Sequence, residues 1–111
     1  MKTDLVTDAT GQLLFFWCPA CATHHAPRVS GTSGPVWTWN GDRDRPTVQP
    51  SIRVEGVQWV SDADLARIRA GEAFDPAPLR CHLFLSDGRI QYLGDCTHAL
   101  AGQIVELEEI P

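Results

Sequence analysis

Residues 13–21 read LLFFWCPAC, and residues 81–98 read CHLFLSDGRIQYLGDCTH. An apolar run that ends in Cys-x-x-Cys is typical of a buried strand leading into a metal-binding turn. The second segment holds the other two of the four cysteines. A chain of 111 residues buries only a modest core, so a metal ion joining the two segments would add stability. Together the segments predict a small domain folded around one metal ion.

An Asp-Gly pair at residues 87–88 predicts a hairpin in the second segment. The pair lies between two alternating apolar and polar runs, as in a two-residue type I′ turn, so residues 80–96 are expected to form the hairpin. If the residues flanking the turn face each other, Cys81 and Cys96 lie on the same face as diagonal neighbours. The two thiols therefore converge by register.

Zinc is the predicted metal, because it commonly takes two ligands from each of two turns or hairpins that are distant in sequence. The predicted ligands are four thiolates: Cys18, Cys21, Cys81 and Cys96. Three histidines compete for these positions or would hydrogen-bond to the ligands: His25, His82 and His98. In the alternative interpretation, the hairpin cysteines are small buried hydrophobic residues and the Cys-x-x-Cys pair is redox-active.

The rest of the chain is predicted to be mainly β, with one helix. Strands are expected at residues 13–17, 36–40, 47–54 and 103–107, with Pro50 on an edge or at a bulge. Ser61, followed by acidic residues, predicts the start of a short helix near residues 61–70, and Gly71 its end. We therefore expect one α+β domain over residues 1–111, a small zinc-braced antiparallel β domain in which residues 57–79 form a helix-containing excursion.

The composition bears on partners and location. The formal charge is −5 and the basic residues alternate with acidic ones, so nucleic acid is not an expected partner. No apolar run approaches the length of a membrane span, and the first residues lack the pattern of a signal peptide. We expect a cytoplasmic protein that does not enter the membrane.

The hairpin also offers an enzyme interpretation. His82 and Asp95 project from the face opposite the cysteines, and with His98 they could act as general base or transition-state stabiliser beside an open zinc site. A closed site of four thiolates leaves no position for water and favours a structural metal. The residues thus favour a binding module over an enzyme.

A second surface is aromatic. Two tryptophans share one face of the strand expected at residues 36–40, and a polar loop follows. Partly exposed tryptophans commonly anchor a ligand or a protein partner, whereas core packing is the more common role of such rings in a small domain. The candidate partner-binding residues are Trp37, Trp39, Asn40 and Asp42.

These residues resemble a family of small phage and prophage proteins often labelled ammonia monooxygenase. The matching elements are the Phe-Trp-Cys-Pro-Ala-Cys run with the following His25, Trp37 to Gly41, Pro46-Thr47 with Pro50-Ser51, and the block from Cys81-His82 to Gly102. That label does not suit a chain without a membrane span. The resemblance implies a phage context in an infected or lysogenic host cell, and it brings no established activity.

We therefore expect a zinc-stabilised binding module that engages a host or phage protein, in a role that counters host defence. The alternatives are a zinc-dependent hydrolase and a reductase that uses the Cys-x-x-Cys pair.

Overall fold

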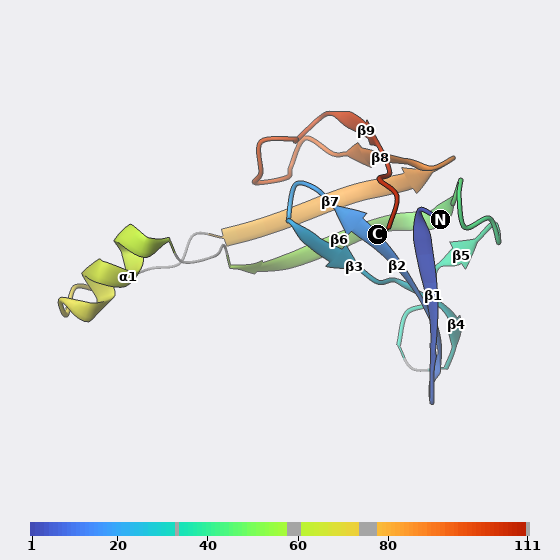
Figure 1. Cartoon of the computed structure of the whole chain (residues 1–111), viewed down its shortest axis with the longest axis horizontal. Helices are drawn as coiled ribbons and strands as arrows, with labels where there is room; N and C mark the ends of the chain where they lie inside the picture. The colour runs from blue at the N-terminus through green and yellow to red at the C-terminus, as the bar shows by residue number, and fades with distance from the viewer. Residues whose placement is uncertain (33, 58–60, 74–77, 111) are drawn as a thin grey trace.

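The computed structural model describes residues 1–32, 34–57, 61–73 and 78–110. These residues form two antiparallel sheets and one short helix, which confirms the mainly β, α+β prediction (Figure 1).

The first sheet is built around β2 (Gly11–Cys18). This strand pairs with β1 (Thr3–Asp8), β3 (Thr23–His25) and β4 (Arg28–Gly31). Alternate side chains of β2 at positions 14, 16 and 18 are buried, as expected for a strand with one face on the core. β1 lies outside the predicted strands because its sequence TDLVTD contains only two large apolar residues.

The second sheet has the order β5-β6-β7-β8-β9. Its strands are β5 (Thr38–Trp39), β6 (Val48–Val57), β7 (Pro78–Ser86), β8 (Arg89–Tyr92) and β9 (Ile104–Glu106). The predicted hairpin is confirmed: Ser86 faces Arg89, and the two turn residues have φ of +50° and +75°. β6 has an irregular register against β7 between Val48 and Ile52, so Pro50 lies at a bulge, as predicted.

The helix α1 (Asp62–Arg69) agrees with the prediction near residues 61–70. The Ser61 side chain caps it by accepting a hydrogen bond of 3.1 Å from the Asp64 amide. No α1 side chain is buried, and the helix lies beyond the far end of the β6–β7 ribbon (Figure 1). Within the predicted excursion, residues 58–60 and 74–77 lie outside the described residues. Among the residues described, no helix is long and apolar enough to cross a membrane.

Both sheets contribute to one buried cluster, and alternation in β7 divides its side chains between two faces. Cys81, Leu83 and Leu85 are at most 1% exposed and point into the core, whereas His82 and Phe84 point the other way. We call these the core face and the outer face of the second sheet. The core consists of Leu14, Phe16, Cys18, Val48, Ile52, Cys81, Leu83, Leu85, Ile90, Tyr92 and Leu107.

Candidate active site and metal centre

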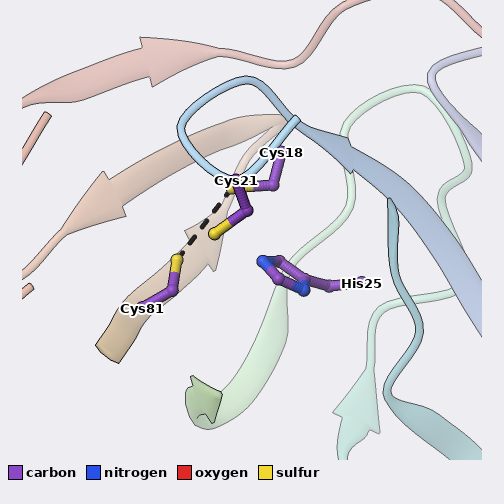
Figure 2. Close-up of side chains that lie close together, drawn as sticks. All are labelled: Cys18, Cys21, His25 and Cys81. Carbon is purple, nitrogen blue, oxygen red and sulfur yellow. Dashed lines mark hydrogen bonds between the residues drawn. The ribbon is translucent and has the colours of Figure 1, made fainter. Parts of the chain in front are cut away.

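Three thiols and one imidazole gather inside the core face. Cys18 ends β2, Cys21 lies in the following turn, His25 ends β3, and Cys81 lies in β7 (Figure 2). One ligand atom from each of the four lies within 4.8 Å of the other three, and the Cys18 and Cys81 sulfur atoms are 4.0 Å apart. The turn is closed by Ala22, whose φ of +52° is uncommon for a residue with a side chain. The cluster therefore joins the first sheet to the second.

The donor set fits a metal ion such as zinc. The Nε2 atom of His25 is buried and, within the described part of the chain, has no hydrogen-bond partner. A buried polar atom without a partner costs free energy, and a cation among the thiols would supply the missing interaction. Three sulfur ligands with one imidazole nitrogen are a common tetrahedral zinc set. The Cys/His cluster can thus hold a metal.

The thiols are electrostatically coupled. The hydrogen bond between Cys18 and Cys81 lowers the pKa of Cys18 to about 3, although burial of Cys18 opposes this shift. Burial and the nearby Cys18 charge raise the pKa of Cys21 to about 11. The hydrogen bond with Cys18, together with burial, raises the pKa of Cys81 well above its ordinary value. Without a cation, one ionised thiol suppresses ionisation of the others, so three thiolates together require a bound positive charge.

Tyr92 supports this cluster. Its hydroxyl lies 3.1 Å from the Cys18 sulfur and can donate a hydrogen bond to the thiolate. Burial, followed by this interaction with Cys18, raises the pKa of Tyr92, so the phenol keeps its proton. The tyrosine thereby orients one sulfur of the cluster.

Cys96, predicted as the fourth thiolate, lies in a neighbouring group with Cys81 and His98. Its sulfur accepts a hydrogen bond of 3.2 Å from the His82 amide and donates one of 3.1 Å to the His82 carbonyl. The His98 Nδ1 atom accepts a hydrogen bond of 3.2 Å from the Leu100 amide, which leaves the proton of a neutral ring on Nε2. The four-residue group therefore contains His25 where the prediction has Cys96.

A hydrogen-bonded Ser–His–Asp arrangement lies on the outer face. The Ser51 hydroxyl is 2.9 Å from His82 Nε2. The other ring nitrogen, Nδ1, lies 3.1 Å and 3.3 Å from the two carboxylate oxygens of Asp95. Serine, histidine and aspartate linked in this order form the triad of serine hydrolases, which is recognised by its geometry on unrelated folds.

The charge of Asp95 fixes the tautomer of His82. Burial opposes ionisation, but the hydrogen bonds from His82 and from its own backbone amide, together with the nearby charge of Arg80, lower the pKa of Asp95. The carboxylate is therefore ionised at neutral pH and can only accept a hydrogen bond, so the His82 proton lies on Nδ1. Nε2 is then free to accept the proton of Ser51, as a general base must.

Local backbone features place these three side chains. The bulge in β6 allows Ser51 to reach across to β7, and the Trp37 indole nitrogen donates a hydrogen bond of 3.2 Å to the Ser51 carbonyl. A tight turn, closed by a 3.2 Å hydrogen bond from the Cys96 amide to the Leu93 carbonyl, carries Asp95 back to His82. The same Cys96 holds both backbone groups of His82, so the base is fixed from two sides.

His82 and Asp95 were predicted to lie on one face, and the structure brings them together. Ser51 was named only within the Pro50-Ser51 element of the family resemblance, and no catalytic role was predicted for it. A signal was present, because Pro50 was predicted to lie on an edge or at a bulge, and bulges are frequent beside active sites. The enzyme hypothesis was, however, centred on the metal and so called for no side-chain nucleophile. His98 lies with Tyr92 at a ring distance of 4.6 Å, away from the serine.

The residues predicted for partner binding form hydrogen bonds within the loop that follows β5. The Trp39 indole donates to the Asp42 carbonyl at 3.3 Å, and the Asn40 side-chain amide donates to the Arg45 carbonyl at 3.1 Å. Backbone hydrogen bonds from Arg45 and Asp44 lower the pKa of Asp42. Trp37 and Trp39 are partly buried against the core. A partner-binding role for these residues stays a prediction.

The fold and the outer-face geometry together describe a small β-rich protein with the side-chain arrangement of a serine hydrolase. The family model described as bacterial ubiquitination-like system serine protease (BubE) matches residues 2–93. The match covers most of the 111 residues, and the chain belongs to this family. It includes the cysteine and histidine cluster, Ser51 and His82, and ends just before Asp95. No curated protein and no solved structure matches the chain.

Proposed function

We propose that this protein is a serine peptidase of a bacterial ubiquitination-like system. Ser51 is the nucleophile, His82 the general base and acid, and Asp95 the residue that orients His82. The observation that carries this proposal is the continuous chain of hydrogen bonds, with distances of 2.9 Å and 3.1 Å, from the serine hydroxyl to the carboxylate. The family description gives the class of bond: a protease cleaves an amide between an acyl group and an amine.

The geometry suits acyl transfer in two steps. The Ser51 oxygen attacks the substrate carbonyl while its proton passes to His82 Nε2, and Asp95 stabilises the resulting imidazolium. His82 then gives this proton to the departing amine, which leaves an acyl ester on Ser51. A water molecule, deprotonated by His82, attacks the ester, releases the acid and restores the serine.

The surroundings suit a macromolecular substrate. The Asp95 side chain is 41% exposed and that of His82 is 21% exposed, so the triad lies at the surface. A hollow of about 170 Å³ lies beside the bulge, lined by residues that include Gln49, Phe84 and Gln91. A shallow, open site admits a chain segment of a folded protein and does not enclose a small molecule. The expected protein partner is thus interpreted as the substrate.

We infer that the metal is zinc, held by Cys18, Cys21, His25 and Cys81, and that its role is structural. Four protein ligands leave no open position, so the chemistry that zinc supplies here is the joining of two sheets. Cys81 directly precedes His82, and the ligand site therefore fixes the backbone that carries the base. The fully buried Cys18 is poorly placed to meet an oxidised substrate, which disfavours the reductase alternative. A phage context and a role against host defence remain predictions.

The proposed function is tested with a fluorophosphonate probe and with hydrolysis of acetylglycine p-nitrophenyl ester. We expect the probe to label Ser51, and Ser51→Ala to lower kcat/KM by at least about 10³-fold without changing the melting temperature. Ser61→Ala, which removes a serine hydroxyl at the start of α1, beyond the far end of the β6–β7 ribbon, is the matched control for activity. Unchanged hydrolysis by Ser51→Ala, or labelling at another residue, would refute the nucleophile.

A further inference from the structure

We propose that the free edge of β6 beside Ser51 binds the extended tail of the substrate as an added β-strand. The tail lies on the acyl side of the scissile bond, and the Arg53 and Glu55 backbones are its hydrogen-bonding partners. This inference rests on the proposed function and names the substrate class of the same site: an unstructured polypeptide tail, recognised through its backbone.

Within the described part of the chain, no strand pairs with this edge over the second half of β6. β5 pairs only with Val48 and Gln49, at the start of the strand. From Ile52 onward, every strand pairing of the described residues in β6 is with β7. An unpaired strand edge presents a row of amide and carbonyl groups that can pair with another chain.

The register shows which backbone groups face outward. On β7, the Arg80 and His82 carbonyls accept hydrogen bonds of 2.9 Å from the Thr97 and Leu93 amides, so both residues turn their backbone groups away from β6. Hydrogen-bonding direction alternates along a strand, and the intervening Cys81 must therefore face β6.

These pairs show which β6 residues direct their backbone groups toward β7 and which direct them toward the free edge. Val54 is opposite Cys81 and bonds to β7, while Arg53 is opposite His82 and Glu55 is opposite Arg80. Arg53 and Glu55 therefore direct their amide and carbonyl groups to the free edge. The Ser51 carbonyl also points away from β7, because it accepts a hydrogen bond from the Trp37 indole N–H.

The edge ends at the nucleophile. The Trp37 indole bonds to the Ser51 backbone, so an added strand that runs along Glu55 and Arg53 must stop beside Ser51. This limit brings one peptide carbonyl of the tail to the serine hydroxyl, while the amine component is left on the side of the bulge.

Backbone pairing suits the acyl component of the bond. In a ubiquitination-like conjugate, the acyl component is the terminal segment of the modifier, whereas the amine component varies with the protein to which it is attached. Strand addition needs an extended segment, reads its backbone and tolerates varied side chains. The charged groups that flank the edge on the outer face already pair with one another: Glu55 lies 3.4 Å from Arg53 and 3.2 Å from Arg80. They therefore do not select a tail of one particular charge.

The first test compares two p-nitrophenyl esters on the whole protein: acetylglycine ester, and acetyl-alanyl-alanyl-alanyl-glycine ester. The longer probe can pair with the edge and should raise kcat/KM by about tenfold to a hundredfold. Arg53→Pro removes an outward amide without taking a hydrogen bond from β7, and it should bring the kcat/KM values of the two esters to the same level. Arg53→Gln, which keeps the amide, is the matched control and should keep the gain.

The second test leaves the protein unchanged. The longer ester is methylated at one amide nitrogen at a time, and β-pairing predicts that activity falls only at alternate positions. Equal rates for the two unmethylated esters, or the same effect of methylation at every position, would overturn the inference. The short ester separates the two proposals, because loss of its hydrolysis in Ser51→Ala tests the nucleophile alone, without the edge.

Discussion

The two faces of the second sheet differ in chemistry although they share the same strands. On the core face, Cys81 is fully buried and meets Cys18, Cys21 and His25. On the outer face the next residue, His82, meets Ser51 and Asp95 at the surface. Alternation along one strand thus separates a stabilising cluster from a reactive one. The comparison predicts that changes on one face alter folding, while changes on the other alter catalysis.

The largest effect is expected on the core face. Structural zinc sites have apparent binding free energies of about 10–16 kcal/mol, comparable with the whole stability of a small domain. Chelation, or His25→Ala, should therefore unfold the protein and release one zinc per chain, as followed by circular dichroism and elemental analysis. Cys96→Ala should retain the metal. The opposite pattern, with zinc kept by His25→Ala and lost by Cys96→Ala, would restore the four-cysteine site.

The next effect belongs to the outer face. Asp95→Asn should lower kcat/KM by about 10³–10⁴-fold, because an amide can favour the wrong tautomer of His82, while the thermal unfolding curve stays in place. Asp87→Asn is the control, since its turn conformation, with φ of +50°, suits asparagine. Near-normal activity of Asp95→Asn would remove Asp95 from the mechanism.

Cys96 contacts both sets of residues, since it lies close to Cys81 and hydrogen-bonds to the backbone of His82. Its thiol holds the His82 amide and carbonyl, so Cys96→Val should lower kcat about tenfold through a misplaced base and leave zinc content unchanged. Cys96→Ser can form both hydrogen bonds and should rescue most of the activity. Equal kcat values for the valine and serine variants would assign Cys96 a packing role only.

The smallest effect is expected at Tyr92. Tyr92→Phe removes the hydroxyl that lies 3.1 Å from the Cys18 sulfur, and it should lower the free energy of unfolding by about 1–2 kcal/mol. Activity at a temperature where the variant is folded should be unchanged. Denaturant unfolding measures the first quantity and ester hydrolysis the second; a fall in kcat would contradict the separation of the two faces.

The hairpin and the helix could be predicted because each depends on local turn or cap chemistry. The convergence of Cys81 with the first cysteine pair could be predicted because a metal ion takes ligands from segments that are distant in sequence. His25 was harder to place. β3 returns antiparallel to β2, with His25 opposite Phe16, and this register depends on the turn at Ala22 with its positive φ. An alanine rarely adopts a positive φ, so the sequence does not predict this turn.

Two further features depend on geometry that the sequence pattern does not carry. β8 ends at Tyr92, and the chain then turns, so Cys96 does not continue the diagonal register assumed for an extended strand. Ser51 meets His82 only because β6 is irregular at that point, and a regular ladder gives no reason to choose this serine over others.

The bulge also constrains how this gene can change in length. From Val48 to Ile52 the chain advances four residues along β6, while the paired positions advance two residues along β7. The bulge therefore holds an even number of extra residues. Even surpluses keep Ile52 and Val54 directed inward, whereas loss of a single codon here would turn the apolar set outward and the charged set inward. Insertions and deletions at this point should therefore add or remove an even number of residues.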